Sequence, residues 1–248
     1  MGALRATRPR PRGRPLSSAP WRIERRHGTP AQLHSWSSVA PVPAGRLVRV
    51  CEALSPAVVL GSTQSPLVVD ADRAAARGVE VVRRRSGGGA VLVEPGAQLW
   101  VDVYLPRGDP LFSDDVSLSF LWLGKCWAGA VRAASPETPS PAVLARNPTH
   151  PLLLARSLCF VGAVAGEVVA GGRKVVGLSQ RRHRAGAWFH SMALLELDPE
   201  ALPSLLAWPA QEQAEGAAEL GRRAAALAGG RGVARRLERE LVERLQAL

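Results

Sequence analysis

Runs and alternations of apolar residues along the chain predict a series of short strands. Residues 57–60 form a continuous apolar run that ends at Gly61, as in a buried strand. Residues 98–105 alternate apolar and polar positions, which is typical of a half-buried strand. Further strands are predicted at 46–52, 79–84, 90–93, 157–162, 167–170, 173–180 and 187–197, with Gly171-Gly172 as a hairpin turn.

Helical spacing appears in other parts of the chain. A long helix is predicted over 115–134, with Ser113 or Asp114 as its N-cap. Because strands and helices mix without regular βαβ alternation, the pattern predicts an α+β fold with a mostly antiparallel central sheet flanked by helices. Further helices are predicted over 70–77 and around 199–208, 211–228 and 233–248, and residues 135–151, with five prolines, predict an irregular connector.

The net charge of +11 is concentrated near the N-terminus. Residues 1–30 hold eight arginines and one acid, Glu24, a net +7 that leaves +4 for the other 218 residues. We therefore expect a disordered Arg/Pro-rich arm over 1–30, without the apolar core of a secretory signal. The remainder lacks a basic stripe with interleaved aromatics, which argues against nucleic-acid binding. No apolar run reaches the ~18–20 residues that a membrane span needs.

The cysteines and histidines exclude some classes of site. The three cysteines, Cys51, Cys126 and Cys159, show no CxxC spacing, and the five histidines are scattered. We therefore expect no disulfide framework and no metal site, and a reducing cytoplasm as the compartment. Asp102 and Asp109 are expected to be surface or capping groups.

Two glycine-rich motifs carry the candidate chemistry. The first, Arg83-Arg84-Arg85-Ser86-Gly87-Gly88-Gly89-Ala90-Val91, joins two predicted strands. Its bare backbone can approach an anion closely, and its arginines supply planar donors. The second is Gly172-Arg173-Lys174-Val175-Val176-Gly177-Leu178-Ser179-Gln180. Lys174 is one of only two lysines among 32 basic residues, so it is unlike an ordinary surface charge.

These motifs, in this order, resemble the lipoate–protein ligase and octanoyltransferase family, whose catalytic domain has the biotin/lipoyl-ligase fold. The resemblance runs from about residue 58 to residue 197. Besides the two motifs, it is carried by Val59-Leu60-Gly61 with Gln64, Cys159-Phe160, Arg181, and Phe189-His190 before Leu194-Leu195.

The resemblance implies transfer of a lipoyl or octanoyl group to a lysine of a small carrier domain. It implies catalytic roles for Lys174, which would place positive charge on the reacting carbonyl or its leaving phosphate, and for Cys159. The substrate-binding residues that it implies are Arg83, Arg84, Ser86, Gly87, Gly88, Gly89, Ala90, Gly177, Ser179, Gln180 and His190, with no metal ligand among them.

Two routes remain open within this interpretation. Some octanoyltransferases of the family carry a Cys-Phe pair about fifteen residues before the motif lysine and form an acyl thioester on that cysteine, as Cys159 would here. A ligase would instead use lipoate and ATP with Mg²⁺ to form an acyl-adenylate, and Cys159 would then be a small buried apolar residue. A transferase needs no cofactor beyond an octanoyl-carrier protein.

The implied partners are lipoyl domains of 2-oxoacid dehydrogenases or the glycine-cleavage H protein, and acyl-carrier protein for a transferase, with no nucleic acid or membrane. The alternative from another class is a non-catalytic acyl- or nucleotide-binding module on the same scaffold. Val93 and Glu94 motivate it, since they stand where the family often has a His-Asp pair. The expected division is the arm over 1–30, a catalytic domain over 31–200, and a helical extension over 201–248 that is short for the accessory domain of ligases.

Overall fold

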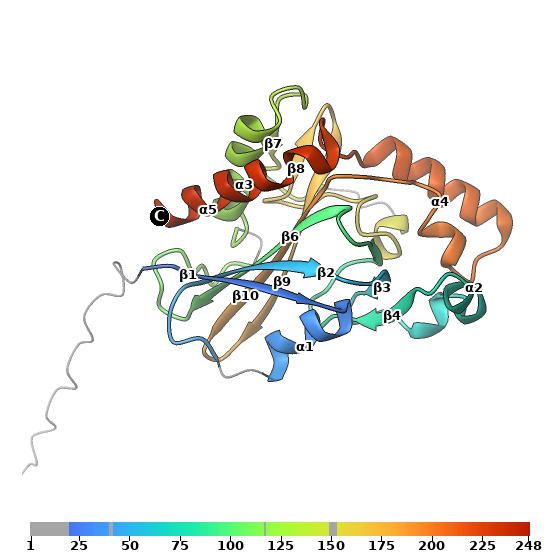
Figure 1. The fold of residues 1–248 in the computed structure, drawn as a ribbon, viewed down its shortest axis with the longest axis horizontal. Coiled ribbons are helices and arrows are strands. Elements are labelled where there is room, and N and C mark those ends of the chain that lie inside the picture. The colour runs from blue at the N-terminus through green and yellow to red at the C-terminus, as the bar shows by residue number, and fades with distance from the viewer. Residues whose placement is uncertain (1–19, 40–41, 117, 149–152) are drawn as a thin grey trace, which may run out of the picture.

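The computed structural model describes residues 20–39, 42–116, 118–148 and 153–248 (Figure 1). A seven-stranded sheet has the order β1-β2-β6-β10-β9-β8-β7, and a three-stranded sheet has the order β4-β3-β5. The strands of the large sheet are β1 (Arg22–Gly28), β2 (Leu47–Ala53), β6 (Gln98–Pro106), β7 (Ala142–Val143), β8 (Val168–Ala170), β9 (Arg173–His183) and β10 (Gly186–Leu194). The small sheet holds β3 (Ala57–Leu60), β4 (Glu80–Arg83) and β5 (Val91–Val93).

Helices cover the sheets. They are α1 (Pro30–Val39), α2 (Ala71–Ala76), α3 (Leu121–Ala134), α4 (Ala210–Arg223) and α5 (Ala234–Gln246), with 3₁₀ turns η1 (Pro66–Val68), η2 (Leu153–Arg156), η3 (Pro203–Leu205) and η4 (Gly230–Val233). The large sheet is antiparallel except for the parallel β1–β2 pair. The α+β fold with a mostly antiparallel central sheet is therefore confirmed.

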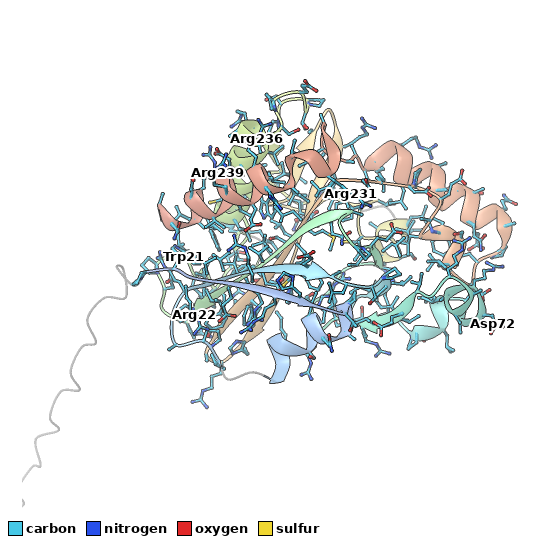
Figure 2. All side chains as sticks on the ribbon, viewed as in Figure 1. Trp21, Arg22, Asp72, Arg231, Arg236 and Arg239 are labelled. Carbon is cyan, nitrogen blue, oxygen red and sulfur yellow. The ribbon has the colours of Figure 1, made fainter. Side chains whose placement is uncertain are left out.

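Helices α3 and α5 cover one face of the large sheet, and Figure 1 shows them side by side. Leu123 and Trp127 of α3 pack with Leu237 and Leu241 of α5 against the strand residue Val103, all of them fully buried. A side-chain contact ties the two helices further, because Arg236, labelled in Figure 2, donates to the carbonyl of Ala134 at the end of α3. This closely packed apolar layer holds in place the strands of the large sheet that carry the candidate active site described below.

The small sheet and α1 pack on the opposite face. There, Val59 and Val93 of the small sheet meet Trp100 of β6 and Leu33 of α1 in one apolar cluster. Strand β6 is consequently buried on both faces along most of its length, rather than half-buried as its alternation predicts. Asp102 is fully buried on this strand, so the expectation that it is a surface or capping group is wrong.

Three other expectations are corrected. Residues 22–28 form β1 at the edge of the large sheet, so an arm extending to residue 30 is wrong, while residues 1–19 lie outside the described part. Helix α3 begins at Leu121, not 115, because the side chains of Ser113 and Asp115 accept bonds from nearby backbone N–H groups and hold turns instead.

Residues 157–162 form turns rather than a strand, since the N–H of Leu158 donates to the carbonyl of Leu154 and that of Val161 to Leu158. The hairpin at Gly171-Gly172 is confirmed, and both residues have positive φ, 56° and 77°. Among the described residues, no helix has the length and apolar character that crossing a membrane requires.

Candidate active site

The glycine loop between β4 and β5 lies packed between two backbone segments. A Cβ on Gly89 would lie 2.8 Å from backbone atoms of Leu158 and Cys159, and a Cβ on Gly61 would lie 1.8 Å from the carbonyl oxygen of Gly88. The N–H of Cys159 also donates to the carbonyl of Ala90 at 2.9 Å. Only glycine permits these approaches, so the loop sequence seats Cys159 against the end of the glycine run.

Arg84 holds this loop from within. Its Nη1 donates to the carbonyl of Val59 at 3.1 Å, and its Nη2 donates to those of Gly87 and Gly89 at 2.9 and 2.8 Å. The side chain is buried, and that burial lowers the pKa of its guanidinium. Two of these bonds go to the loop and one to β3, and the buried Nε has no hydrogen-bond partner among the described residues. Arg83, in contrast, is exposed at the end of β4.

The two glycine-rich motifs meet at a cavity of about 50 Å³. The hydroxyls of Ser86 and Ser179 lie 2.9 Å apart and join the motifs directly. Val93 is a fully buried part of the wall, so the wall is apolar where the family often has histidine. The lining residues are His34, Val59, Arg84, Val91, Val93, Trp100, Cys159, Phe160, Gly177, Leu178, Ser179, His190, Ser191 and Met192.

Some of the residues named from the sequence lie outside this lining. Gly87 and Gly88 are exposed on the loop, and Gln180 receives a bond from Ser119 and donates to the carbonyl of Val116. The lysine of the second motif, Lys174, is also absent from the lining.

Lys174 is buried behind the cavity wall, where its ammonium is surrounded by hydrogen-bond acceptors. Its ammonium donates to the carbonyls of Cys159 and Gly162 at 2.9 and 3.0 Å, and it lies 2.8 Å from Oε1 of Glu167. Glu167 also accepts bonds from the N–H groups of Val164 and Leu178, each at 2.9 Å. The three N–H bonds of the ammonium therefore all have acceptors, in a site from which water is excluded.

The three cysteines have different environments. Cys51 and Cys126 are buried in the core, and burial raises the pKa of the Cys51 thiol well above its usual value and that of Cys126 to about 11. Cys159 is half-buried and lines the cavity. It is therefore the cysteine best placed for chemistry with a bound molecule.

His190 in the cavity wall is paired with the buried Asp102. Both residues were named from the sequence, but their pairing was not predicted from it. Oδ1 of Asp102 accepts from Nε1 of Trp100 at 2.7 Å and lies 2.9 Å from Nδ1 of His190. Burial on its own would raise the pKa of Asp102, but the charge and hydrogen bond of His190 hold that pKa below its usual range. An ionised carboxylate only accepts, so Nδ1 of His190 carries the proton in this contact.

The same residues belong to a polar row that crosses the sheet. Glu24, Arg49, Asp102, His190 and Ser179 stand directly opposite one another on β1, β2, β6, β10 and β9. Directly opposed residues project from the same face of a sheet. The row therefore runs from the sheet edge to the cavity. A correct prediction of the register between these strands would have revealed it.

A second imidazole stands over this row. The ring of His34, from α1, lies 4.6 Å from the Trp100 ring and 5.9 Å from that of His190 between centroids. Burial, together with the charge of His190, lowers the pKa of His34 to about 3. His34 is therefore a neutral imidazole at ordinary pH.

The sequence family described as the lipoyl protein ligase A/B catalytic domain matches residues 37–233. The chain belongs to this family.

Two relatives in sequence are octanoyltransferases named LipM. The chain is 30% identical over 148 residues to that of Kyrpidia tusciae, covering 57% of this chain and 51% of the relative. It is 28% identical over 160 residues to that of an Exiguobacterium species, covering 64% and 57% respectively. The chain thus spans about half the length of the relatives that it matches.

Solved structures share the fold. A bi-partite lipoate protein ligase of Thermoplasma acidophilum, described with its E2 lipoyl domain, superposes with a TM-score of 0.67 at 17% identity, covering 92% of this chain and 84% of that one. A lipoate-protein ligase A bound with ATP gives 0.64 at 17% identity, covering 92% and 86%. At such identities the likeness supports the fold alone.

Proposed function

We propose that this protein transfers an octanoyl or lipoyl group to a lysine of a lipoyl carrier domain, and that the group passes through a thioester on Cys159. The observation that carries the proposal is the position of Cys159, half-buried in the wall of an apolar cavity while Cys51 and Cys126 lie in the core. A thiol at the edge of an apolar slot can receive an acyl carbonyl while the chain enters the slot.

The Lys174 side chain supports this role by holding the backbone at Cys159. Its ammonium donates to the main-chain carbonyl of Cys159, which fixes the segment that carries the thiol. The thiolate is the form of a cysteine that attacks an acyl carbon. The new C–S bond forms on Cys159 as the bond between the acyl carbon and its donor breaks, and the donor leaves with the proton.

The sequence relatives support octanoyl transfer in particular, since two of them are named octanoyltransferases. The adenylate route is the alternative, and ATP with Mg²⁺ is its co-substrate. Arg84, one of the residues expected to bind phosphate, already donates to three backbone carbonyls. The carrier-protein donor is therefore proposed from the sequence relatives, and the adenylate route is the alternative that the experiment tests.

The test is intact-protein mass spectrometry after mixing the full chain with octanoyl-carrier protein. We expect an octanoyl adduct on the wild type and on Cys126→Ala, a matched control that removes a core cysteine, and none on Cys159→Ala. The same variants are then assayed for acylation of a lipoyl domain. Full transfer by Cys159→Ala would exclude the thioester, and pyrophosphate release from ATP in that assay would identify the adenylate route.

The non-catalytic alternative is tested in the same assay. A binding module would give no acylated lipoyl domain from any donor, with either free lipoate and ATP or octanoyl-carrier protein. Lys174→Ala tests the catalytic role that the resemblance implies for the lysine, and unchanged transfer in this variant would exclude that role.

A further inference from the structure

Acylation of a lysine requires a proton acceptor at the site. A lysine side chain has a pKa of about 10.4 and is an ammonium at neutral pH, so it must lose a proton before its nitrogen can attack. This requirement is the same whether the acyl group sits on Cys159 or on an adenylate. The inference below rests on the proposed transfer to a carrier lysine through a thioester on Cys159.

Few described groups can accept that proton. The titratable residues in the cavity lining are His34, Arg84, Cys159 and His190. Arg84 remains protonated in proteins and is committed to the loop carbonyls. His34 has a pKa lowered to about 3, which makes it a poor acceptor at neutral pH.

The two charged groups behind the wall are also unsuited. Lys174 already carries its full set of protons, and Glu167 is occupied by that ammonium and two backbone N–H groups. Cys159 is the residue proposed to bear the acyl group. Of the titratable residues in the cavity lining, His190 is therefore the one left to accept the proton.

The geometry points to His190 as the general base that takes the proton from the attacking lysine, with Asp102 as the residue that positions it. Nδ1 of His190 is bound to Oδ1 of Asp102, so Nε2 is the nitrogen left with a lone pair. Trp100 donates to the same carboxylate oxygen and fixes its orientation. A buried carboxylate, an oriented imidazole and a cavity form the arrangement from which general bases act.

Two protons leave the lysine nitrogen in this step. Nε2 of His190 takes the first from the ammonium and then releases it to solvent. The neutral nitrogen forms a bond to the acyl carbon, the bond from that carbon to the Cys159 sulfur breaks, and the second proton passes from the nitrogen to the leaving thiolate. His190 and Cys159 return to their starting states, and the product is an amide.

Charged and titratable groups face His190 from several elements. Asp102 comes from β6, His34 from α1, Arg84 from the loop after β4, and Cys159 from the segment before β8. Arg49 of β2 stands one strand further along the same row. Variants of His190, and of Asp102 that positions it, therefore report on the general-base role, whereas variants of the other neighbours do not.

The experiment compares two nucleophiles in single-turnover reactions of the full chain loaded with an octanoyl donor. One is the lysine of a lipoyl domain, which must be deprotonated, and the other is hydroxylamine, which is already neutral at pH 7. We expect His190→Gln to slow transfer to the lysine by about 100-fold or more, the usual range for loss of a general base, and to change the hydroxylamine rate little. His27→Gln is the matched control, because His27 forms a similar pair with Glu52 at 2.8 Å on an exposed edge.

A second readout does not depend on how well that variant folds. Asp102→Asn should slow the lysine reaction selectively, because Asp102 orients His190. Equal losses for both nucleophiles in the two variants would overturn the general-base role. A wild type that never acylates the lipoyl domain would instead refute the proposed function itself.

Discussion

The ammonium of Lys174 lies 2.8 Å from a carboxylate oxygen of Glu167, and each side chain is only 3% exposed. The lysine expected to face the reacting carbonyl is therefore neutralised behind the cavity wall, where it also bonds the carbonyl of Cys159. Lys174 contacts the site by bonding the backbone of the segment that carries the candidate nucleophile. Glu167 thus positions Lys174 and, through it, residues 159–162.

Removing one partner of this buried pair should be costly. We expect Glu167→Gln to lower the free energy of unfolding by about 3 kcal/mol, because it leaves an ammonium uncompensated in a dry site. Urea unfolding measures the loss. The double variant Glu167→Gln with Lys174→Met should recover part of it, since no charge is then left unpaired. Additive losses in the double variant would show that the two side chains do not interact.

Two neighbouring glycines of the loop should respond differently to alanine. Gly89→Ala places a Cβ 2.8 Å from the backbone of Leu158 and Cys159, whereas a Cβ on Gly87 meets no heavy atom within 4 Å. We expect Gly89→Ala to cost about 1–3 kcal/mol and to impair transfer, because the segment bearing Cys159 must shift. Gly87→Ala is the control and should unfold at nearly the wild-type urea concentration. Similar behaviour of the two variants would contradict the close packing of the loop.

The three thiols should react with iodoacetamide at very different rates. Cys159 is half-buried at a cavity, whereas Cys51 and Cys126 are buried and burial raises the pKa of each. A raised pKa leaves the thiol protonated and unreactive at pH 8. We therefore expect one fast alkylation in the native protein, located at Cys159 by peptide mapping and lost in Cys159→Ala. Rapid alkylation of Cys126 would show that the core around this residue is accessible to the reagent.

Acid should destabilise the protein through His34. Its pKa is lowered to about 3 in the folded state, so between pH 6.5 and 3 the unfolded chain binds a proton that the folded chain does not. Stability from this group is thus complete above about pH 6.5 and declines as the pH falls, by at most about 1.4 kcal/mol per pH unit. Urea unfolding at pH 7 and 4.5 should show a smaller acid loss for His34→Gln than for wild type or His27→Gln. An equal loss in all three would assign the acid sensitivity to other groups.

Local patterns in the sequence predict much of the fold. The Gly171-Gly172 turn, the strands flanking the glycine run and the α+β class all depend on short-range chemistry, and the structure has them. The start of α3 was misplaced because polar side chains near Ser113 satisfy the backbone in turns that helical periodicity does not reveal.

The site was predictable only in part, because its key pairs depend on strand register. Asp102 and His190 are 88 residues apart in the chain and meet because β6 and β10 align them directly. The pairing of Glu167 with Lys174 was not predictable from strand alternation either. Glu167 lies just before β8, and a register irregularity between Val168 and Val169 interrupts the alternation there.

Strand β1 determines where a shortened version of this protein can begin. The family match begins at residue 37, after β1 has ended at Gly28. A shortened protein that began there would lose the Glu24 carboxylate, which lies 3.4 Å from the Arg49 guanidinium. It would also leave β2 as an open sheet edge, able to recruit a strand from another molecule. Aggregation of such a fragment would therefore result from the missing strand and would not show that the longer protein is unstable.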